Sequence, residues 1–202
     1  MLRIIAGSAG GLHLFSPPGS LRPTMDRVRA AIFSSLGDRV PGARCLDLFA
    51  GTGAMGLEAL SRGATSCIFV EQRRAHATCI ERNLERTKLA DRKNSPVLQI
   101  DALAYIERRA PAAAFDLIFA DPPYYLQNNQ DVDFPTMLLT SEKLRQALAP
   151  DGLFVLEKNP LAPCVIPPAW ELRKSKRYGI TEITYLVPAA SNRPEEKVSQ
   201  EI

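Results

Sequence analysis

The chain has 202 residues, of which 46% are hydrophobic and 23% are charged. This composition is typical of a folded globular domain and excludes a wholly disordered chain. The formal net charge is only +3, so overall charge alone cannot make the whole surface a nucleic-acid-binding one. The charge is unevenly spread, because residues 1–44 hold six arginines against two aspartates, or +4.

The four cysteines are widely spaced and form no CxxC pair, so neither a disulfide framework nor a metal site is expected. No apolar run reaches the roughly 18 residues that span a membrane. The first residues also lack the order of a signal peptide. We therefore expect a cytoplasmic protein without a membrane partner, and a monomer, since nothing indicates an obligate dimer.

The N-terminal part predicts two elements. Residues 2–15 are typical of a short β-hairpin around a glycine-rich turn at Gly7–Gly11. After a break at Pro17–Gly19, Thr24 can cap a helix. The apolar positions of that helix recur every four residues, at Val28, Ile32 and Leu36.

From residue 44 the pattern alternates between strands and helices. Strands are expected at 45–50, 67–70, 97–100, 115–120 and 153–156, and a terminal hairpin at 170–187. Helices are expected between them, the last running through Leu138, Leu144 and Leu148 after a polar loop at 124–134. This order indicates an α/β fold with a mostly parallel, seven-strand, Rossmann-like sheet covered by helices on both faces. We expect a hairpin extension over 1–21, one domain over 22–188 and a flexible tail over 189–202.

A glycine-rich segment, Asp47-Leu-Phe-Ala-Gly51-Thr-Gly53-Ala-Met-Gly56, lies between the first of these strands and the next helix. Glycines there permit a tight turn and a close approach of ligand to backbone. Glu71, twenty residues after Gly51, ends the next strand and could accept hydrogen bonds from ribose hydroxyls. The segment therefore predicts a nucleoside site. Its letters also satisfy GxGxxG, so an NAD-dependent oxidoreductase is an alternative.

A second motif follows the fourth strand of this series, where ligands bind in open α/β sheets. A carboxylate and a fixed backbone carbonyl there could accept hydrogen bonds from an exocyclic base amine and stabilise the charge that develops on its nitrogen. Two prolines make the segment rigid, and an aromatic ring could stack on a base extruded from its helix. The motif consists of Asp121, Pro122, Pro123 and Tyr124.

Together the two motifs resemble class I S-adenosylmethionine-dependent methyltransferases, and the second is similar to enzymes that methylate adenine N6, cytosine N4 or guanine N2. The resemblance implies that Asp101 and the Ala102 backbone contact the adenine of the cofactor and that Glu71 contacts its ribose. It also implies that the methionine end is held by Asp47, Phe49, Ala50, Gly51, Thr52 and Gly53.

Longer segments narrow the resemblance. Arg3-Ile-Ile-Ala-Gly, Leu21-Arg-Pro-Thr, Leu46-Asp-Leu-Phe-Ala-Gly and Gly56-Leu-Glu-Ala-Leu-Ser-Arg-Gly-Ala resemble bacterial small-subunit (16S) ribosomal RNA guanine-N2 methyltransferases, over about residues 3–187. The hairpin turn departs from that family, because Ala9–His13 lacks its usual basic residues. The residues expected to contact RNA are Arg3, Arg22, Thr24, Arg27 and Arg29.

We therefore expect direct methyl transfer from S-adenosylmethionine to guanine N2, on naked ribosomal RNA or an assembled small subunit. A DNA adenine-N6 methyltransferase could use the same motif, although 202 residues leave no room for a separate target-recognition domain. A non-enzymatic RNA-binding protein is a further alternative. The basic cluster Arg173, Lys174, Lys176 and Arg177 could contact RNA backbone or simply form a solvated strand.

Overall fold

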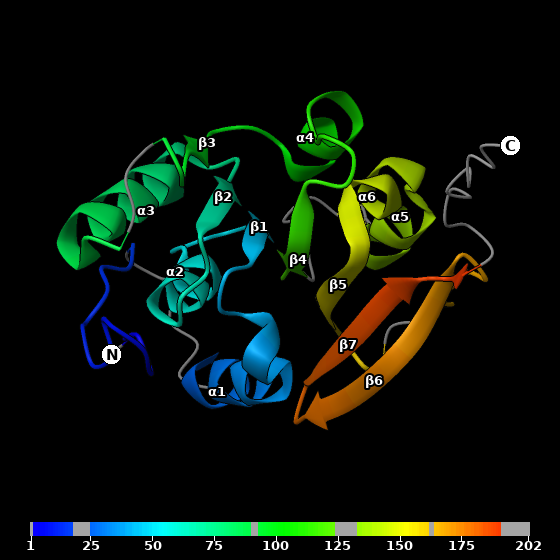
Figure 1. Ribbon diagram of the computed structural model, residues 1–202, viewed down its shortest axis with the longest axis horizontal. Coiled ribbons are helices and arrows are strands. Elements are labelled where there is room, and N and C mark those ends of the chain that lie inside the picture. The colour runs from blue at the N-terminus through cyan, green and yellow to red at the C-terminus, as the bar shows by residue number, and fades with distance from the viewer. Residues whose placement is uncertain (1, 18–24, 90–92, 124–132, 162–163, 191–202) are drawn as a thin grey trace, which may run out of the picture.

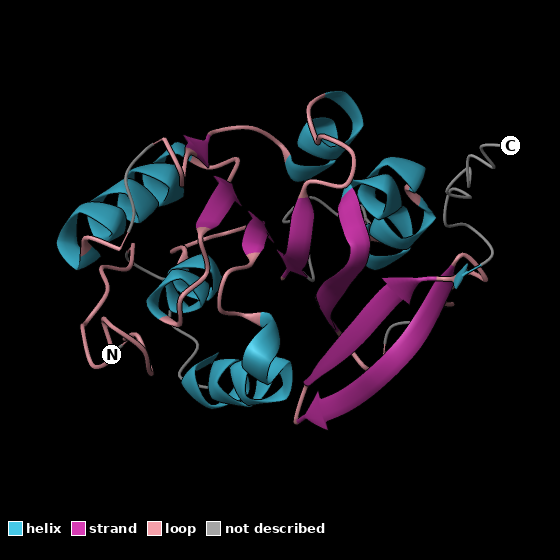
Figure 2. Ribbon diagram, viewed as in Figure 1, coloured by secondary structure: helices cyan, strands magenta, loops and turns pink. Residues whose placement is uncertain are grey.

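The computed structural model describes residues 2–17, 25–89, 93–123, 133–161 and 164–190 (Figure 1). The strands in these ranges are β1 (Arg44–Leu48), β2 (Ser66–Val70), β3 (Val97–Leu98), β4 (Phe115–Ala120), β5 (Leu148–Lys158), β6 (Trp170–Tyr178) and β7 (Thr181–Pro188). The helices are α1 (Met25–Leu36), the 3-10 turn η1 (Gly37–Arg39), α2 (Ala54–Ser61), α3 (Arg74–Thr87), α4 (Ala102–Arg108), α5 (Phe134–Thr140) and α6 (Glu142–Ala147). Figure 2 distinguishes the two kinds of element.

The seven strands form one sheet in the order β3-β2-β1-β4-β5-β7-β6. The five strands from β3 to β5 run parallel, whereas β7 is antiparallel to both of its neighbours. The prediction of a mostly parallel, seven-strand α/β sheet is confirmed. In such a sheet the carboxyl ends of the parallel strands meet at one edge, and the motifs after β1 and β4 lie at this edge.

Helices α1, α2 and α3 cover one face of the sheet and α4, α5 and α6 cover the other (Figure 1). Successive strand side chains alternate between the faces. In β4, Leu117 and Phe119 pack with the α1–α3 core, while Ile118 and Ala120 pack with the α4–α6 core. Both faces of the central strands are thus buried. None of the helices in the described ranges is both long and apolar enough to cross a bilayer.

The N-terminal hairpin is narrow. Its strands meet in one antiparallel bridge, between Arg3 and His13, which is flanked by a hydrogen bond from the Ile4 N–H to the Leu12 carbonyl oxygen over 2.9 Å. Ile4 and Leu14 are buried in the α1–α3 core. The hairpin is therefore held mainly by contacts with the domain rather than by its own ladder.

Two predicted elements differ in the structure. The helix expected through Leu138, Leu144 and Leu148 is divided between α5 and α6, and Leu148 belongs to β5. The break occurs because Ser141 is extended and its hydroxyl caps α6 by accepting from the Leu144 N–H over 3.2 Å. Leu148 pairs instead with Phe115 of β4. The third parallel strand is also shorter than expected, since β3 spans only Val97–Leu98.

Candidate active site

The loop after β1 carries the left-handed backbone that its glycines permit. Gly51 has φ +56° and Gly53, which precedes α2, has φ +77°. A Cβ at Gly51 would meet only the Phe49 carbonyl oxygen, at 3.8 Å. The backbone at Gly51 therefore leaves room for the close approach of a ligand.

The third glycine of the pattern has a different role. A Cβ at Gly56 would lie 2.3 Å from Cε1 of Phe69 and 2.5 Å from Sγ of Cys67. Gly56 therefore allows α2 to pack directly on β2, which needs no ligand. The three glycines of the GxGxxG pattern thus differ: Gly51 is open, Gly53 supplies the left-handed backbone before α2, and Gly56 serves packing.

Asp47 lies in β1 beneath this loop and is buried. Its Oδ2 accepts a hydrogen bond from the Gly56 N–H over 2.9 Å. The pKa of Asp47 is raised to about 7, chiefly by burial and also by the nearby charge of Glu71, against the opposing effect of the Gly56 hydrogen bond. The carboxyl can therefore change its protonation near neutral pH.

Glu71 follows β2 and is also buried. Its Oε2 accepts from the Gly51 N–H over 2.8 Å, and its Oε1 accepts from the Arg73 N–H over 2.7 Å. Nδ1 of His76 lies 3.8 Å from Oε2. Glu71 thus holds the glycine loop in place, in addition to the ribose contact expected of it.

Asp101 and Ala102 begin α4 beside the end of β3. Asp101 is half-buried and caps the helix, with Oδ1 accepting from the Ala104 N–H over 2.9 Å. Ala102 is buried. Asp101 and Ala102 follow β3, and Glu71 follows β2, which is the neighbour of β3 in the sheet. The two acidic side chains therefore follow adjacent strands.

The second motif directly follows β4. Asp121 is half-buried, Pro122 is buried and Pro123 is exposed, while Tyr124 lies outside the described residues. A small cavity brings Asp121 together with Asp47 and with Glu157 of β5, and its apolar lining includes Ile32, Met55 and Phe119. The two motifs, 74 residues apart from Asp47 to Asp121, therefore share one cavity. Sequence reasoning missed Glu157, which follows the apolar run of β5 and has no motif of its own.

Of the five residues expected to contact RNA, the structure describes three, and these differ in exposure. Arg3 and Arg27 are exposed, and the Arg3 guanidinium lies 3.9 Å from the Asp26 carboxylate. Arg29 is buried, with 2% of its surface exposed, and this corrects the expectation that it faces RNA. Its guanidinium donates to the carbonyl oxygen of Arg3 and, over 3.0 Å, to Asp26. Arg22 and Thr24 lie outside the described residues.

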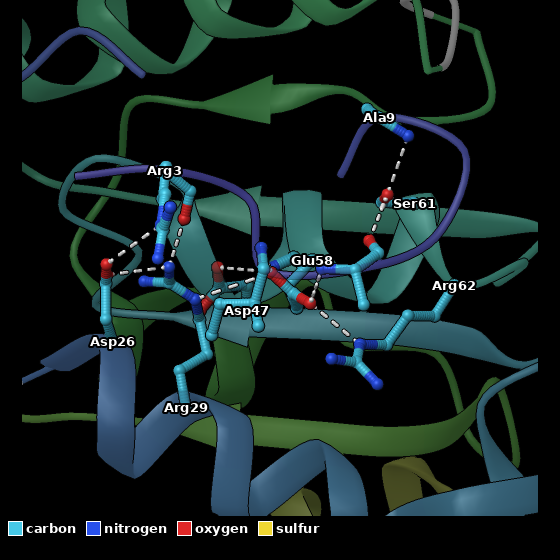
Figure 3. Close-up of polar contacts among 11 residues, drawn as sticks. Arg3, Ala9, Asp26, Arg29, Asp47, Glu58, Ser61 and Arg62 are labelled. Carbon is cyan, nitrogen blue, oxygen red and sulfur yellow. Dashed lines mark hydrogen bonds and ion pairs between the residues drawn. The ribbon is translucent and has the colours of Figure 1, made fainter. Parts of the chain in front are cut away.

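Glu58 of α2 explains why Arg29 is buried (Figure 3). The Glu58 side chain is fully buried and lies 3.6 Å from Nε of Arg29 and 2.7 Å from Nε of Arg62. It also accepts from the backbone N–H groups of Ile5 and Ala6, over 2.7 and 3.1 Å. One carboxylate therefore joins the N-terminal hairpin to α1 and α2.

Ser61 of α2 completes this attachment. Its hydroxyl donates to the Ala6 carbonyl oxygen over 2.6 Å and accepts from the Ala9 N–H over 3.0 Å. Gly7 packs so closely that a Cβ would lie 1.9 Å from the Ser61 carbonyl oxygen. The segment Gly56–Ala64, singled out in the sequence without a role, serves to dock the hairpin.

Asn83 of α3 links the same N-terminal segment to the glycine loop. It is fully buried. Its Nδ2 donates to the carbonyl oxygens of Phe15 and Thr52, over 3.1 and 3.0 Å, and its Oδ1 accepts from the Phe15 N–H over 2.7 Å. No local motif marks Asn83, because both partners are distant in sequence.

Comparison with known proteins identifies the family. The family model described as Conserved hypothetical protein 95 matches residues 2–187. Ribosomal RNA small subunit methyltransferase D of Haemophilus influenzae is 33% identical over 181 residues, covering 89% of this chain and 90% of its own. The enzyme of the same name from Escherichia coli K12 is 39% identical over 125 residues, covering 61% and 60%.

A solved structure of a hypothetical protein from Thermus thermophilus matches with a TM-score of 0.73 and 28% identity, covering 94% of this chain and 100% of that one. The relatives are named for ribosomal RNA methylation. The alternative of a DNA adenine-N6 methyltransferase therefore has no support from these comparisons.

Proposed function

The chain belongs to the family described as Conserved hypothetical protein 95, and we propose that it transfers a methyl group from S-adenosylmethionine to the exocyclic N2 amine of a guanine in small-subunit ribosomal RNA. The observation that carries this proposal is the shared cavity of Asp47 and Asp121. This cavity brings Asp47 of β1, the strand before the glycine loop, next to Asp121, which begins the motif expected to bind the amine. The relatives named for small-subunit ribosomal RNA support the choice of substrate.

The residues around the glycine loop fit the proposed cofactor. The backbone at Gly51 is open where a Cβ would otherwise stand, which suits close contact with a nucleoside-linked chain. Asp47, Glu71 and Asp101 bring acidic groups to neighbouring strands, which suits a cofactor with a cationic sulfonium and an amino group. When bound, S-adenosylmethionine supplies the methyl group on that sulfonium.

The chain's own part in the reaction is to hold the amine. We propose that the carboxylate of Asp121 and the backbone carbonyl of Pro122 accept hydrogen bonds from it, which orients the nitrogen lone pair and stabilises the developing positive charge. A carboxylate is too weak a base to deprotonate a neutral amine beforehand. Pro122 and Pro123 make the segment rigid, and Tyr124 would stack on the extruded base.

The RNA would be recruited by exposed residues of the N-terminal part. Arg3 and Arg27 are exposed there, and Arg22 and Thr24 belong to the same proposal on the evidence of sequence alone. Phosphate contacts of this kind give affinity without reading sequence. The substrate is then naked small-subunit RNA or the assembled small subunit. The protein would act on it as a monomer in the cytoplasm.

A transfer assay with labelled S-adenosylmethionine tests the proposal. The purified protein is offered undermethylated small ribosomal subunits, naked small-subunit RNA and duplex DNA, with the impaired variant Asp121→Ala as the control. We expect label in one or both RNA arms and none in DNA. Label confined to DNA, or no transfer to any substrate by a protein that binds the cofactor, would contradict the proposal.

A further inference from the structure

Strand β6 forms the free edge of the sheet beyond β7 (Figure 1). All of its residues from 171 to 177 are exposed. Four of these are cationic, Arg173, Lys174, Lys176 and Arg177, against the single anion Glu171. The excess of positive charge on this strand has no part in the site described above.

A surface cavity opens where β6 meets the end of α1 and the start of β5. Its polar lining consists of Ser35, Arg39, Asp151, Arg173, Lys174 and Tyr185. The three cations face one carboxylate, and the two hydroxyl groups add donors. Cations and hydroxyl donors together form the chemistry that binds phosphate.

Two of the cations are held by neutral partners. Nζ of Lys174 donates to the Ser35 hydroxyl over 2.9 Å and lies 5.7 Å from the centre of the Tyr185 ring. Nη1 of Arg39 donates to the Asp151 carbonyl oxygen over 3.1 Å. These contacts fix the positions of Arg39 and Lys174. The third cation, Arg173, forms an ion pair with Glu171, with 2.9 Å between Nη1 and Oε1, so two acidic residues, Glu171 and Asp151, accompany the three cations.

Protection of the sheet edge does not account for this cavity. Lysines on an edge strand do prevent pairing with another chain, which suffices for Lys176. Arg39, however, lies on η1, away from the edge. Arg173 falls where the β6–β7 register shifts, between Leu172 and Lys174, and lines the same cavity.

The same strand, β5, lines this cavity and the cavity that contains Asp121. Leu153 of β5 lines the first cavity, and Glu157, four residues further along β5, lines the second. At about 3.3 Å per residue, Leu153 and Glu157 are roughly 13 Å apart along the strand, and Val155 between them also lines the second cavity.

In the β6–β7 register, Lys174 stands opposite Tyr185, which lines the first cavity, and Lys176 stands opposite Ile183, which lines the second. Two cations of β6 therefore lie on the face of the sheet that both cavities share.

We propose that the cavity bounded by Arg39, Arg173 and Lys174 binds a backbone phosphate of the RNA substrate beside the target nucleotide. The proposal rests on the proposed function for the identity of the RNA. An arginine matches a phosphate with two parallel donors. The phosphate bound here would hold the flanking RNA while the target base occupies the site at the end of β4.

The test measures RNA affinity apart from methyl transfer. Arg39→Gln/Arg173→Gln removes two charges and keeps most of each side chain, and Arg108→Gln/Arg109→Gln is the matched control. Arg108 and Arg109 are exposed at the end of α4, on the other face of the sheet. Binding of small-subunit RNA is measured over a range of salt, together with steady-state transfer, calorimetric S-adenosylmethionine affinity and thermal melting.

For Arg39→Gln/Arg173→Gln we expect RNA affinity to fall about tenfold or more. The slope of log affinity against log salt should become shallower by about 1.4, for two lost contacts to single-stranded RNA. KM for RNA should rise with kcat unchanged, because the contact is the same in ground and transition states. Cofactor affinity and melting temperature should stay at the wild-type values.

Wild-type RNA affinity and salt slope in Arg39→Gln/Arg173→Gln would overturn the inference. Equal weakening by Arg108→Gln/Arg109→Gln would also overturn it, because the effect would then be one of general charge. Wild-type protein that methylates only DNA would refute the proposed function instead, and that outcome is read in the transfer assay rather than in the binding assay.

Discussion

The Glu71 carboxylate accepts a hydrogen bond from the Gly51 N–H over 2.8 Å, across the ends of two adjacent parallel strands. The acidic residue expected to bind the cofactor ribose therefore also sets the position of the loop expected to bind the methionine end. Because both functions depend on one side chain, its loss should affect cofactor binding more than stability of the domain.

Glu71→Ala should weaken S-adenosylmethionine binding about ten- to a hundredfold, the equivalent of about 1.5–3 kcal/mol for a lost charge-assisted hydrogen bond. Calorimetric titration measures the affinity, with Glu107→Ala on the exposed side of α4 as the control. Unchanged affinity in Glu71→Ala would remove this residue from the cofactor site.

Asp121→Ala should lower kcat about 10²- to 10³-fold, the usual effect of removing one group that stabilises developing charge. Its melting temperature and cofactor affinity should remain close to wild type, because Asp121 is only half-buried and follows β4 rather than supporting it. Asp38→Ala, on exposed η1, is the control. A parallel loss of cofactor binding would assign Asp121 to the cofactor instead.

Tyr124 is predicted from the sequence to stack on the extruded base. Tyr124→Ala should lose most of the methyl transfer, while Tyr124→Phe should be much milder because the ring face remains. Single-turnover rates with saturating cofactor make the comparison. Turnover of Tyr124→Ala at the wild-type rate would show that no stacking occurs.

Asp47 should make stability fall as pH rises. Its pKa is raised by burial from 3.8 to about 7 in the folded protein, so between these values the folded state binds the proton more tightly than the unfolded state does. The free energy of unfolding therefore decreases across this window, by up to about 4 kcal/mol, and is constant above it. Asp47→Asn has no proton to lose and should not show the decrease.

Urea unfolding over a pH series measures this difference. Asp116 offers a control of opposite sign, because the hydrogen bond from Arg44 lowers its pKa. Its contribution is present at neutral pH and is lost as pH falls through that lowered pKa. Wild-type and Asp47→Asn curves that run parallel between about pH 4 and 7 would contradict the Asp47 prediction.

Glu58→Gln should destabilise the protein by up to about 3–5 kcal/mol, because it removes the buried one of the two carboxylates beside the buried Arg29 guanidinium and leaves only the half-buried Asp26. The double variant Arg29→Met/Glu58→Gln should recover part of the loss, since Arg29 then carries no charge. Chemical denaturation of Glu58→Gln, Arg29→Met and the double variant gives the coupling energy between the two side chains. Additive losses would show that the two side chains do not interact.

The sheet could be predicted from the sequence because its signals are local. Apolar runs such as Cys67–Val70 and Phe115–Ala120 end at motifs that only the carboxyl edge of a parallel sheet brings together. The boundary at Leu148 could not be predicted in the same way. Leu144 and Leu148 continue a helical spacing, and only the pairing of Leu148 with Phe115 decides for a strand.

The docking of the N-terminal hairpin could not be predicted either. Arg27 and Arg29 look equivalent in sequence, and their difference depends on Glu58, whose hydrogen bond to the Ile5 N–H spans 53 residues. Glu157 and Asn83 likewise reach the site only through the tertiary fold. In contrast, the acidic residues at the strand ends could be predicted from the sequence, because each follows an apolar run of its own.

The most direct test of the proposed activity identifies the methylated nucleoside. Undermethylated small subunits are treated with the protein and labelled S-adenosylmethionine. The RNA is then digested to nucleosides, which are separated and identified by mass spectrometry. The account predicts label in N2-methylguanosine, formed far more slowly with Asp121→Ala. Label in N6-methyladenosine, or in any nucleoside other than a guanosine methylated at N2, would contradict it.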